Sequence, residues 1–116
     1  MRYLLLIYEN PATTPKQGEA SWDAMMADYS AYTGWLEQTG QLLGGEALQD
    51  ASSATSVTLR GGRRIVTDGP FAETKEVLGG YYLIRAADLD AAIEAAGRIP
   101  SARHGIIEIR PILEMG

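Results

Sequence analysis

The N-terminal segment, residues 2–8, constrains the fold most, because it is apolar on both of the faces that a strand presents. Its sequence, RYLLLIY, places large apolar side chains at odd and even positions alike. Successive side chains of a strand point to opposite sides of a sheet, so such a segment must be covered twice. We therefore predict a central strand over residues 2–8, with one layer of structure on each side.

The hydrophobic period then changes from that of a strand to that of a helix. Residues 10–18 contain two prolines, two threonines and a glycine, which predicts a loop. Beyond them, large side chains recur at helical spacing, at Trp22, Met25, Met26, Tyr29, Tyr32 and Leu36. Ser21 is the predicted N-cap and Gly40 the predicted C′ residue. A stripe of this kind is more often core than a cofactor site, and we predict core.

Four further strands are predicted between residue 41 and residue 84. Residues 41–48 (QLLGGEAL) predict a short strand, whose paired glycines mark a bulge or a close approach to the backbone. Residues 55–60 and 63–67 flank Gly61-Gly62, the two-residue spacing of a tight hairpin. Residues 79–84 (GGYYLI) predict the next strand.

A second helix and a last strand complete the chain. Asp88 is the predicted cap of a helix that ends at Ile99-Pro100, with an apolar stripe at Leu89, Ala92, Ile93 and Ala96. Residues 105–112 (GIIEIRPI) predict the last strand, and Pro111 indicates a strand end or a sheet edge.

Apart from the locally paired hairpin, the order of elements is βαββαβ, the ferredoxin-like split unit of the α+β class. Its sheet is antiparallel, and both helices lie on one face. The other face of so small a protein needs a cover that the chain itself does not supply. We therefore predict a homodimer in which the two sheets meet face to face.

Composition restricts the classes of function. A length of 116 residues predicts a single domain, 1–116. With no cysteine and one histidine, His104, neither a thiolate nor a His-rich metal site is available within one chain, and we expect no cofactor. A net charge of −5 argues against nucleic-acid binding. The first apolar run ends at Glu9, too short to span a membrane, so a cytoplasmic protein is expected.

The run TDGPFAETKE, residues 67–76, indicates where a functional site could lie. Gly69 permits a positive φ, Pro70 fixes its own φ, and Phe71 is the one phenylalanine of the chain. Asp68 therefore stands on a stiff, anchored turn, which suits a binding or catalytic carboxylate. Alternatively, its carboxylate only accepts hydrogen bonds from its own turn. Lys75, Arg63 or Arg64 could pair with it, although the arginines also fit a solvated hairpin tip.

Other candidates lie on the predicted strands and the first helix. Tyr81 and Tyr82 must point to opposite faces of one strand. Glu46, just past the paired glycines, faces either a pocket or a solvated edge. Either a cleft between the first helix and the sheet is lined by Tyr8, Tyr29, Tyr32 and Trp35, or these residues pack in the core. His104 is predicted to be a loop residue. The predicted ligand-binding set, with Asp68 as the catalytic candidate, is Asp68, Phe71, Tyr8, Tyr32, Glu46 and Tyr82.

Residues 68–76, with Gly79-Gly80-Tyr81-Tyr82-Leu83-Ile84, closely resemble the DGPF-domain proteins of the YCII-related superfamily. Residues 43–46 (LGGE) and 98–103 (RIPSAR) are similar to that family as well. The resemblance implies a dimeric α+β barrel of ferredoxin-like protomers. Members of the family are often encoded near, or fused to, extracytoplasmic-function sigma factors of bacteria.

The same resemblance bears on Asp68. The wider superfamily includes a dehydrochlorinase-type enzyme that acts on a substituted hydroquinone, and proteins with a proposed His-Asp pair. The aspartate of that pair lies in an Asp-Pro-Phe motif that would match Asp68, and its histidine lies in the first half of the chain, where this sequence has none. Two functions follow: a small-molecule-binding, enzyme-like dimer with Asp68 in the pocket, or a non-catalytic regulatory module linked to a sigma factor.

Overall fold

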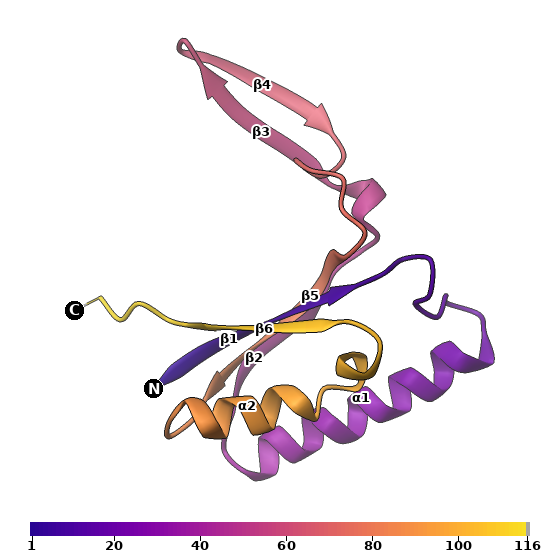
Figure 1. Cartoon of the computed structure of the whole chain (residues 1–116), viewed down its shortest axis with the longest axis vertical. Coiled ribbons are helices and arrows are strands. Elements are labelled where there is room, and N and C mark those ends of the chain that lie inside the picture. Colours follow the sequence, from indigo (N-terminus) through magenta and orange to yellow (C-terminus); the bar gives the residue numbers. More distant parts are fainter. Residues whose placement is uncertain (116) are drawn as a thin grey trace.

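The computed structural model describes residues 1–115, which form an antiparallel four-stranded sheet with two helices on one face (Figure 1). The strand order is β2-β5-β1-β6, the order of a ferredoxin-like split unit. The elements of this body are β1 (Arg2–Glu9), α1 (Ala20–Gln38), β2 (Leu42–Ala47), β5 (Val77–Arg85), α2 (Leu89–Gly97) and β6 (Ile106–Pro111). The α+β prediction is confirmed, including β1 as an inner strand and β6, with Pro111, at an edge.

The core lies between β1 and the two helices. Tyr3, Leu5 and Ile7 alternate along β1 and are at most 4 % exposed. They meet Leu36 of α1, Ile84 of β5 and the alanines of α2. The burial of each such side chain contributes about 1.5–3 kcal/mol to the free energy of unfolding. The face of the sheet turned to the helices is therefore the one that this chain covers by itself.

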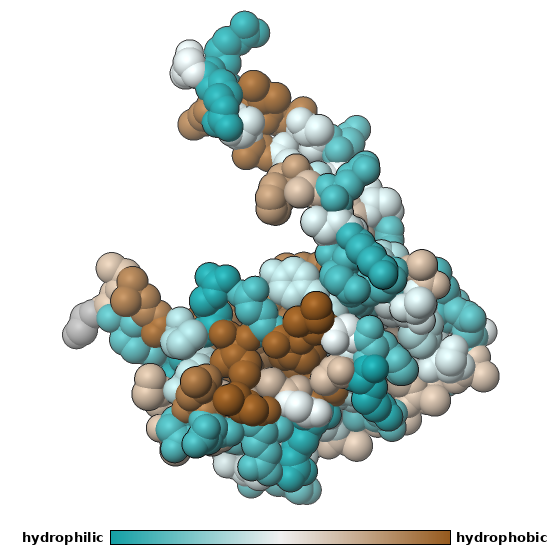
Figure 2. All heavy atoms as spheres, viewed as in Figure 1, coloured by the Kyte–Doolittle hydropathy of each residue, from teal (hydrophilic) through white to brown (hydrophobic). Residues whose placement is uncertain are grey.

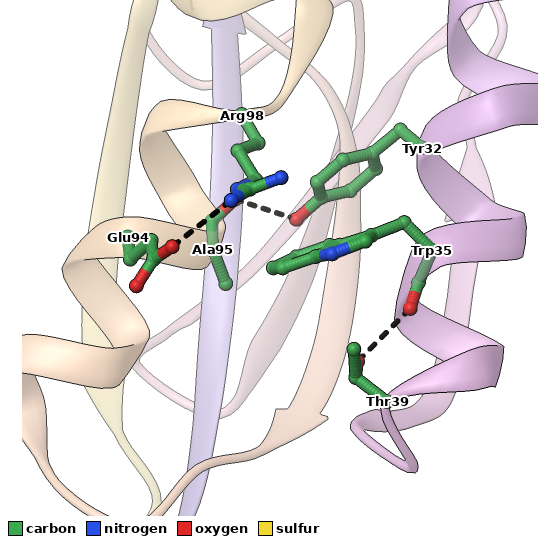
Figure 3. Close-up of polar contacts among 6 residues, drawn as sticks. All are labelled: Tyr32, Trp35, Thr39, Glu94, Ala95 and Arg98. Carbon is green, nitrogen blue, oxygen red and sulfur yellow. Dashed lines mark hydrogen bonds and ion pairs between the residues drawn. The ribbon is translucent and has the colours of Figure 1, made fainter.

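Polar contacts hold the two helices together (Figure 3). The buried Tyr32 hydroxyl donates a hydrogen bond of 2.7 Å to the carbonyl oxygen of Ala95. The guanidinium of Arg98 lies 4.2 Å from the centre of the Trp35 ring and forms an ion pair with Glu94, one turn earlier in α2. Cation–π contacts of this kind contribute about 0.5–1 kcal/mol at exposed sites. Trp35, one of the predicted cleft residues, therefore joins the helices.

The limits of the first helix differ in part from the prediction. The N-cap is Glu19, and Ser21 lies inside the helix. Gly40 has a φ of 72°, as predicted for the residue that follows the C-cap. Only the C-terminal half of the predicted stripe, Tyr32 and Leu36, is buried. The N-terminal half diverges from the sheet, and of its large side chains only Tyr29 packs against the core.

The second helix is capped as predicted, but the face that it turns to the core is not the predicted one. The Asp88 carboxylate accepts a hydrogen bond of 2.9 Å from the Ala91 N–H. The buried positions are Ala92, Ala95 and Ala96. Leu89 and Ile93, predicted to face the core, are half exposed. Alanines let the helix approach the sheet more closely than larger side chains would, and this close approach decides which face is buried.

The predicted hairpin forms a separate two-stranded sheet that projects from the body (Figure 1). We call β3 (Thr55–Arg60) and β4 (Arg63–Asp68) the arm. Gly61 and Gly62 have φ values of 56° and 77°, which confirms the predicted glycine turn. A short 3₁₀ helix, η1 (Ala51–Ser53), and residues 69–76 join the arm to β2 and β5.

The face of the sheet opposite the helices is apolar, and no helix or strand among the described residues, 1–115, covers it. Leu4 and Leu6 alternate with the core residues of β1 and pair with Leu83 and Tyr81 of β5. Ile106 of β6 is on this same face, opposite Tyr8, and is 59 % exposed. We call this surface the open face. Residues 2–8 are predicted to be covered on both sides, and the described chain covers only the side that faces the helices.

Candidate functional site

A cavity of about 760 Å³ lies between the N-terminal half of α1 and strands β2 and β5. Binding sites for small molecules have volumes of about 300–1,000 Å³ and mostly apolar walls. The loop between β1 and α1 and the residues after β2 close its sides. Its lining includes Trp22, Met25, Met26 and Tyr29 on α1, and Gly45, Ala47, Gly80 and Tyr82 on the sheet.

The cavity exists because the sheet carries small residues where the helix diverges from it. A Cβ atom at Gly45 would lie 2.8 Å from the Tyr81 carbonyl oxygen, and one at Gly80 would lie 2.9 Å from the Glu46 carbonyl oxygen. The register between β2 and β5 also shifts between Leu42 and Gly44. The predicted bulge and close backbone approach are both confirmed. Glycine is required here for strand spacing, and the same absence of side chains leaves the space above the sheet empty.

A chain of three hydrogen-bonded groups reaches the wall of the cavity. The Ser101 Oγ donates to Glu9 Oε1 at 2.8 Å, and the Tyr29 hydroxyl lies 2.6 Å from the same Ser101 Oγ. Because Ser101 uses its single proton on the Glu9 carboxylate, Tyr29 must donate to Ser101. Ser101 is 5 % exposed, whereas Tyr29 and Glu9 both line the cavity. The free lone pairs of the Tyr29 oxygen can therefore accept a hydrogen bond from a bound molecule.

The titration of Tyr29 follows from its surroundings. Burial raises the pKa of its hydroxyl to about 12, and the nearby Glu9 carboxylate acts in the same direction. Tyr29 therefore keeps its proton at neutral pH. It can pass a proton along the chain toward Glu9 only by taking another in exchange.

A second hydroxyl pair lies on the same side of the sheet. Thr33 Oγ1 and the Tyr82 hydroxyl are 2.8 Å apart, and burial raises the pKa of Tyr82. The Tyr82 ring meets the ring of Tyr32 edge-on, with 5.2 Å between centroids. Thr33 and Tyr82 both line the cavity, whereas Tyr32 lies behind it in the core. The cavity thus has aromatic walls and hydroxyl groups from both α1 and β5.

The structure brings together only part of the predicted ligand-binding set. Tyr82 and Glu46 line the cavity, although Glu46 is exposed. Tyr32 is a buried core residue. Tyr8 lies on the open face, because it follows Ile7 in the alternation of β1.

Asp68 and Phe71 lie apart from the cavity, on and beside the arm. Both are exposed, and Phe71 is 95 % exposed. Within residues 1–115 the Asp68 carboxylate takes part in no salt bridge and accepts no hydrogen bond. The turn is held instead by the Gly69 N–H, 2.6 Å from the Ala54 carbonyl oxygen. Gly69 has the predicted positive φ, 94°. One chain therefore gives Asp68 neither a concave surrounding nor the turn hydrogen bonds that the alternative assumes.

Sequence reasoning missed Glu9 and Ser101 as site residues. In the sequence, Glu9 marks only the end of an apolar run. Ser101 lies in a 3₁₀ turn, η2 (Pro100–Arg103), and is 92 residues from Glu9 in the sequence. A serine directly after a helix-ending proline gives no signal of burial. His104, at the end of this turn, is exposed.

Two absences apply to the described residues, 1–115. No group of three or more His, Cys, Asp or Glu side chains there is arranged to hold a metal ion. No helix in this range combines the length and the apolar character needed to cross a membrane.

Comparisons with known proteins are consistent with this fold. The family model of the YCII-related domain matches residues 1–116. An uncharacterized protein of Rhizobium meliloti is 35 % identical over 114 residues, which cover 97 % of this chain and 92 % of the relative. A 5-chloro-2-hydroxyhydroquinone dehydrochlorinase from Burkholderia phenoliruptrix, solved with 2,5-dihydroxybenzoquinone, superposes with a TM-score of 0.55. That match covers 99 % of this chain and 96 % of the enzyme at 13 % identity, so it shows a shared fold.

Proposed function

Given that the chain belongs to the YCII-related domain family, we propose that it is a small-molecule-binding, enzyme-like protein that works as a homodimer. The cavity between α1 and the sheet is the proposed binding site. One observation carries the proposal: the Glu9–Ser101–Tyr29 chain delivers an oriented oxygen acceptor to an otherwise largely apolar cavity. Such a combination binds a ligand by burial and orients it by a few polar contacts.

The walls of the cavity favour a flat ring that carries a hydroxyl or amino group. Trp22, Tyr29 and Tyr82 supply aromatic surface, and Met25 and Met26 supply adaptable apolar surface. The Tyr29 oxygen accepts from a donor on the ligand. The dehydrochlorinase of similar fold was solved with a dihydroxylated ring compound, which belongs to the same broad chemical class.

The same groups suggest how a reaction would be assisted. A ligand hydroxyl that hydrogen-bonds to Tyr29 would lose its proton to Tyr29 as Tyr29 passes its own proton to Ser101. Ser101 in turn passes its proton to Glu9. Glu9 is then the final proton acceptor, in the role of a general base that acts through two hydroxyls.

The homodimer and Asp68 form the other part of the proposal. A second copy is the natural cover of the open face, because Leu4, Leu6 and Leu83 repeat on it and a two-fold axis pairs such a surface with itself. An interface of this kind buries about 2,000 Å² or more in total. We retain Asp68 as a proposed site residue only in this assembly, where a second copy would shield it from water.

The binding proposal is tested by a thermal-shift screen with hydroxylated aromatic compounds and their methyl ethers. A ligand at about 100 times its dissociation constant stabilises the protein by about 2.7 kcal/mol. We expect hydroxylated rings to stabilise the protein, methyl ethers to bind more weakly, and Tyr29→Phe to remove that preference. Tyr8→Phe, on the open face, is the matched control and should leave it intact. Equal binding of the ethers, or an unchanged preference in Tyr29→Phe, would contradict the proposed acceptor.

A second candidate is a regulatory module that acts through a protein partner such as a sigma factor. The exposed apolar residues of the arm and Phe71 favour it. An absence of binding across the screen, together with an arm that stays exposed in the purified homodimer, would favour this alternative over the cavity.

A further inference from the structure

Within residues 1–115, no other helix or strand packs extensively against the arm. Every residue of β4 is exposed, and β3 and β4 make their extensive contacts with each other alone. An isolated two-stranded hairpin is at best marginally stable in water. The radius of gyration is 16.1 Å, against about 13 Å for a compact chain of this length. The extended shape therefore calls for a surface against which the arm can pack.

The two faces of the arm differ in character. Residues directly opposite each other in an antiparallel pair share a face, so Val57 with Val66, Leu59 with Arg64 and Thr55 with Asp68 form one side. Val57, Leu59 and Val66 are 60 %, 66 % and 58 % exposed. The other side carries Ser56, Thr58, Thr67 and the arginines next to the turn, with Ile65 as its one large apolar residue. Figure 2 shows apolar side chains of the arm uncovered between hydrophilic ones.

Charge indicates what kind of surface suits the arm. Residues 55–68 contain three arginines and one aspartate, a net charge of +2, which leaves −7 on the rest of a chain whose total is −5. The body of another copy thus carries a net charge opposite to that of the arm. Complementary potentials steer such surfaces together and fix their register.

The position of the arm fits a second copy as well. In Figure 1 the helices lie on one side of the sheet, and the arm rises on the other, the side of the open face. A copy stacked on the open face would therefore be placed beside the arm. Both apolar surfaces that lack a cover, the arm and the open face, would be covered in one assembly.

We infer that the arm of each chain docks on the body of a second copy, with Val57, Leu59 and Val66 turned toward it. This inference rests on the homodimer of the proposed function and adds the arm as a second contact with the partner. Asp68 stands at the base of the same arm face. Docking shields its carboxylate and places it beside the second copy, so the turn that carries Asp68 and Phe71 becomes part of the interface.

The test is sedimentation equilibrium of the full chain over a range of concentrations, with single substitutions on the two faces of the arm. We expect Val57→Asp and Leu59→Asp to raise the dimer dissociation constant about tenfold or more, because tenfold corresponds to about 1.4 kcal/mol and burial of one such side chain exceeds that. Thr67→Asp adds the same charge at an exposed position on the opposite face. Its dimer dissociation constant should stay within about twofold of the wild-type value, as expected for an exposed substitution. Circular dichroism verifies that each variant is folded.

Hydrogen exchange of residues 55–68 gives an independent readout. In the wild-type dimer we expect slowed amide exchange along the arm, and in Leu59→Asp we expect that protection to be lost. An arm that exchanges freely in the dimer, or arm variants that dimerise as the wild type does, would overturn the inference. Leu6→Asp on the open face separates the two proposals. If it alone dissociates the dimer, face-to-face dimerisation stands and arm docking fails, and a wild-type monomer at micromolar concentration refutes both.

Discussion

Replacing Ser101 by alanine tests the hydrogen-bonded chain on which the proposed site depends. The substitution removes the donor to Glu9 Oε1 and the acceptor for the Tyr29 hydroxyl in one step. A hydrogen bond to a charged group contributes about 1.5–3 kcal/mol, and a buried donor left unpaired costs about 1–3 kcal/mol. Because Glu9 and Tyr29 border the cavity, water can form some of the hydrogen bonds that the substitution removes. We expect the free energy of unfolding to fall by about 2–3 kcal/mol.

Tyr29→Phe removes only the end of the chain and leaves the bond between Ser101 and Glu9 intact. We expect it to cost about 1 kcal/mol. In the Ser101→Ala background the Tyr29 hydroxyl has already lost its partner, so its removal should cost almost nothing. The double variant should then be about 1 kcal/mol more stable than the sum of the single effects predicts.

Urea unfolding followed by circular dichroism measures these differences, at one fixed protein concentration because dimerisation contributes to apparent stability. Ser30→Ala, an exposed helix position, is the control and should change stability by less than about 0.5 kcal/mol. The reasoning is refuted if Ser101→Ala costs no more than this control, or if the effects of Ser101→Ala and Tyr29→Phe are additive.

Three further outcomes are expected. Gly45→Ala should cost about 1–3 kcal/mol in urea unfolding, because its Cβ would lie 2.8 Å from a backbone oxygen of β5, whereas Gly44→Ala meets nothing within 4 Å and should be nearly neutral. Valine at both Gly61 and Gly62 should abolish the protection of the amides at the arm tip against hydrogen exchange, since both positions have positive φ. Unchanged amide protection would contradict this. Finally, the contribution of Tyr29 to stability should be constant below its ordinary pKa of 10.0 and fall as the pH rises toward about 12, because the folded state holds the proton more tightly. Because burial also raises the pKa of Tyr82, Tyr29→Phe should reduce this loss of stability in a pH series of urea unfolding without abolishing it.

Much of the fold could be predicted from local patterns. The two-sided apolar run at residues 2–8 gave β1, and helical spacing gave α1 and α2. Gly61-Gly62 gave the hairpin, and Asp88 gave a helix start. These signals depend on neighbours within a few residues, where backbone sterics and side-chain alternation act directly. The errors, at Ser21, Leu89 and Ile93, arose where packing against the sheet chose the helix face and helix start.

The candidate site was less accessible to such reasoning. The sequence determined by itself that Asp68 stands on a turn with a positive φ at Gly69, and that glycines interrupt β2. Only the tertiary structure joined Glu9 to Ser101, 92 residues away, and Ser101 to Tyr29, 72 residues away. It also placed Asp68 on the arm and Phe71 beside it, outside the cavity that Tyr82 and Glu46 line. The physical reason is that periodicity reports which side of an element is apolar, whereas a cavity forms where two elements diverge over small residues, and that depends on every contact that positions them.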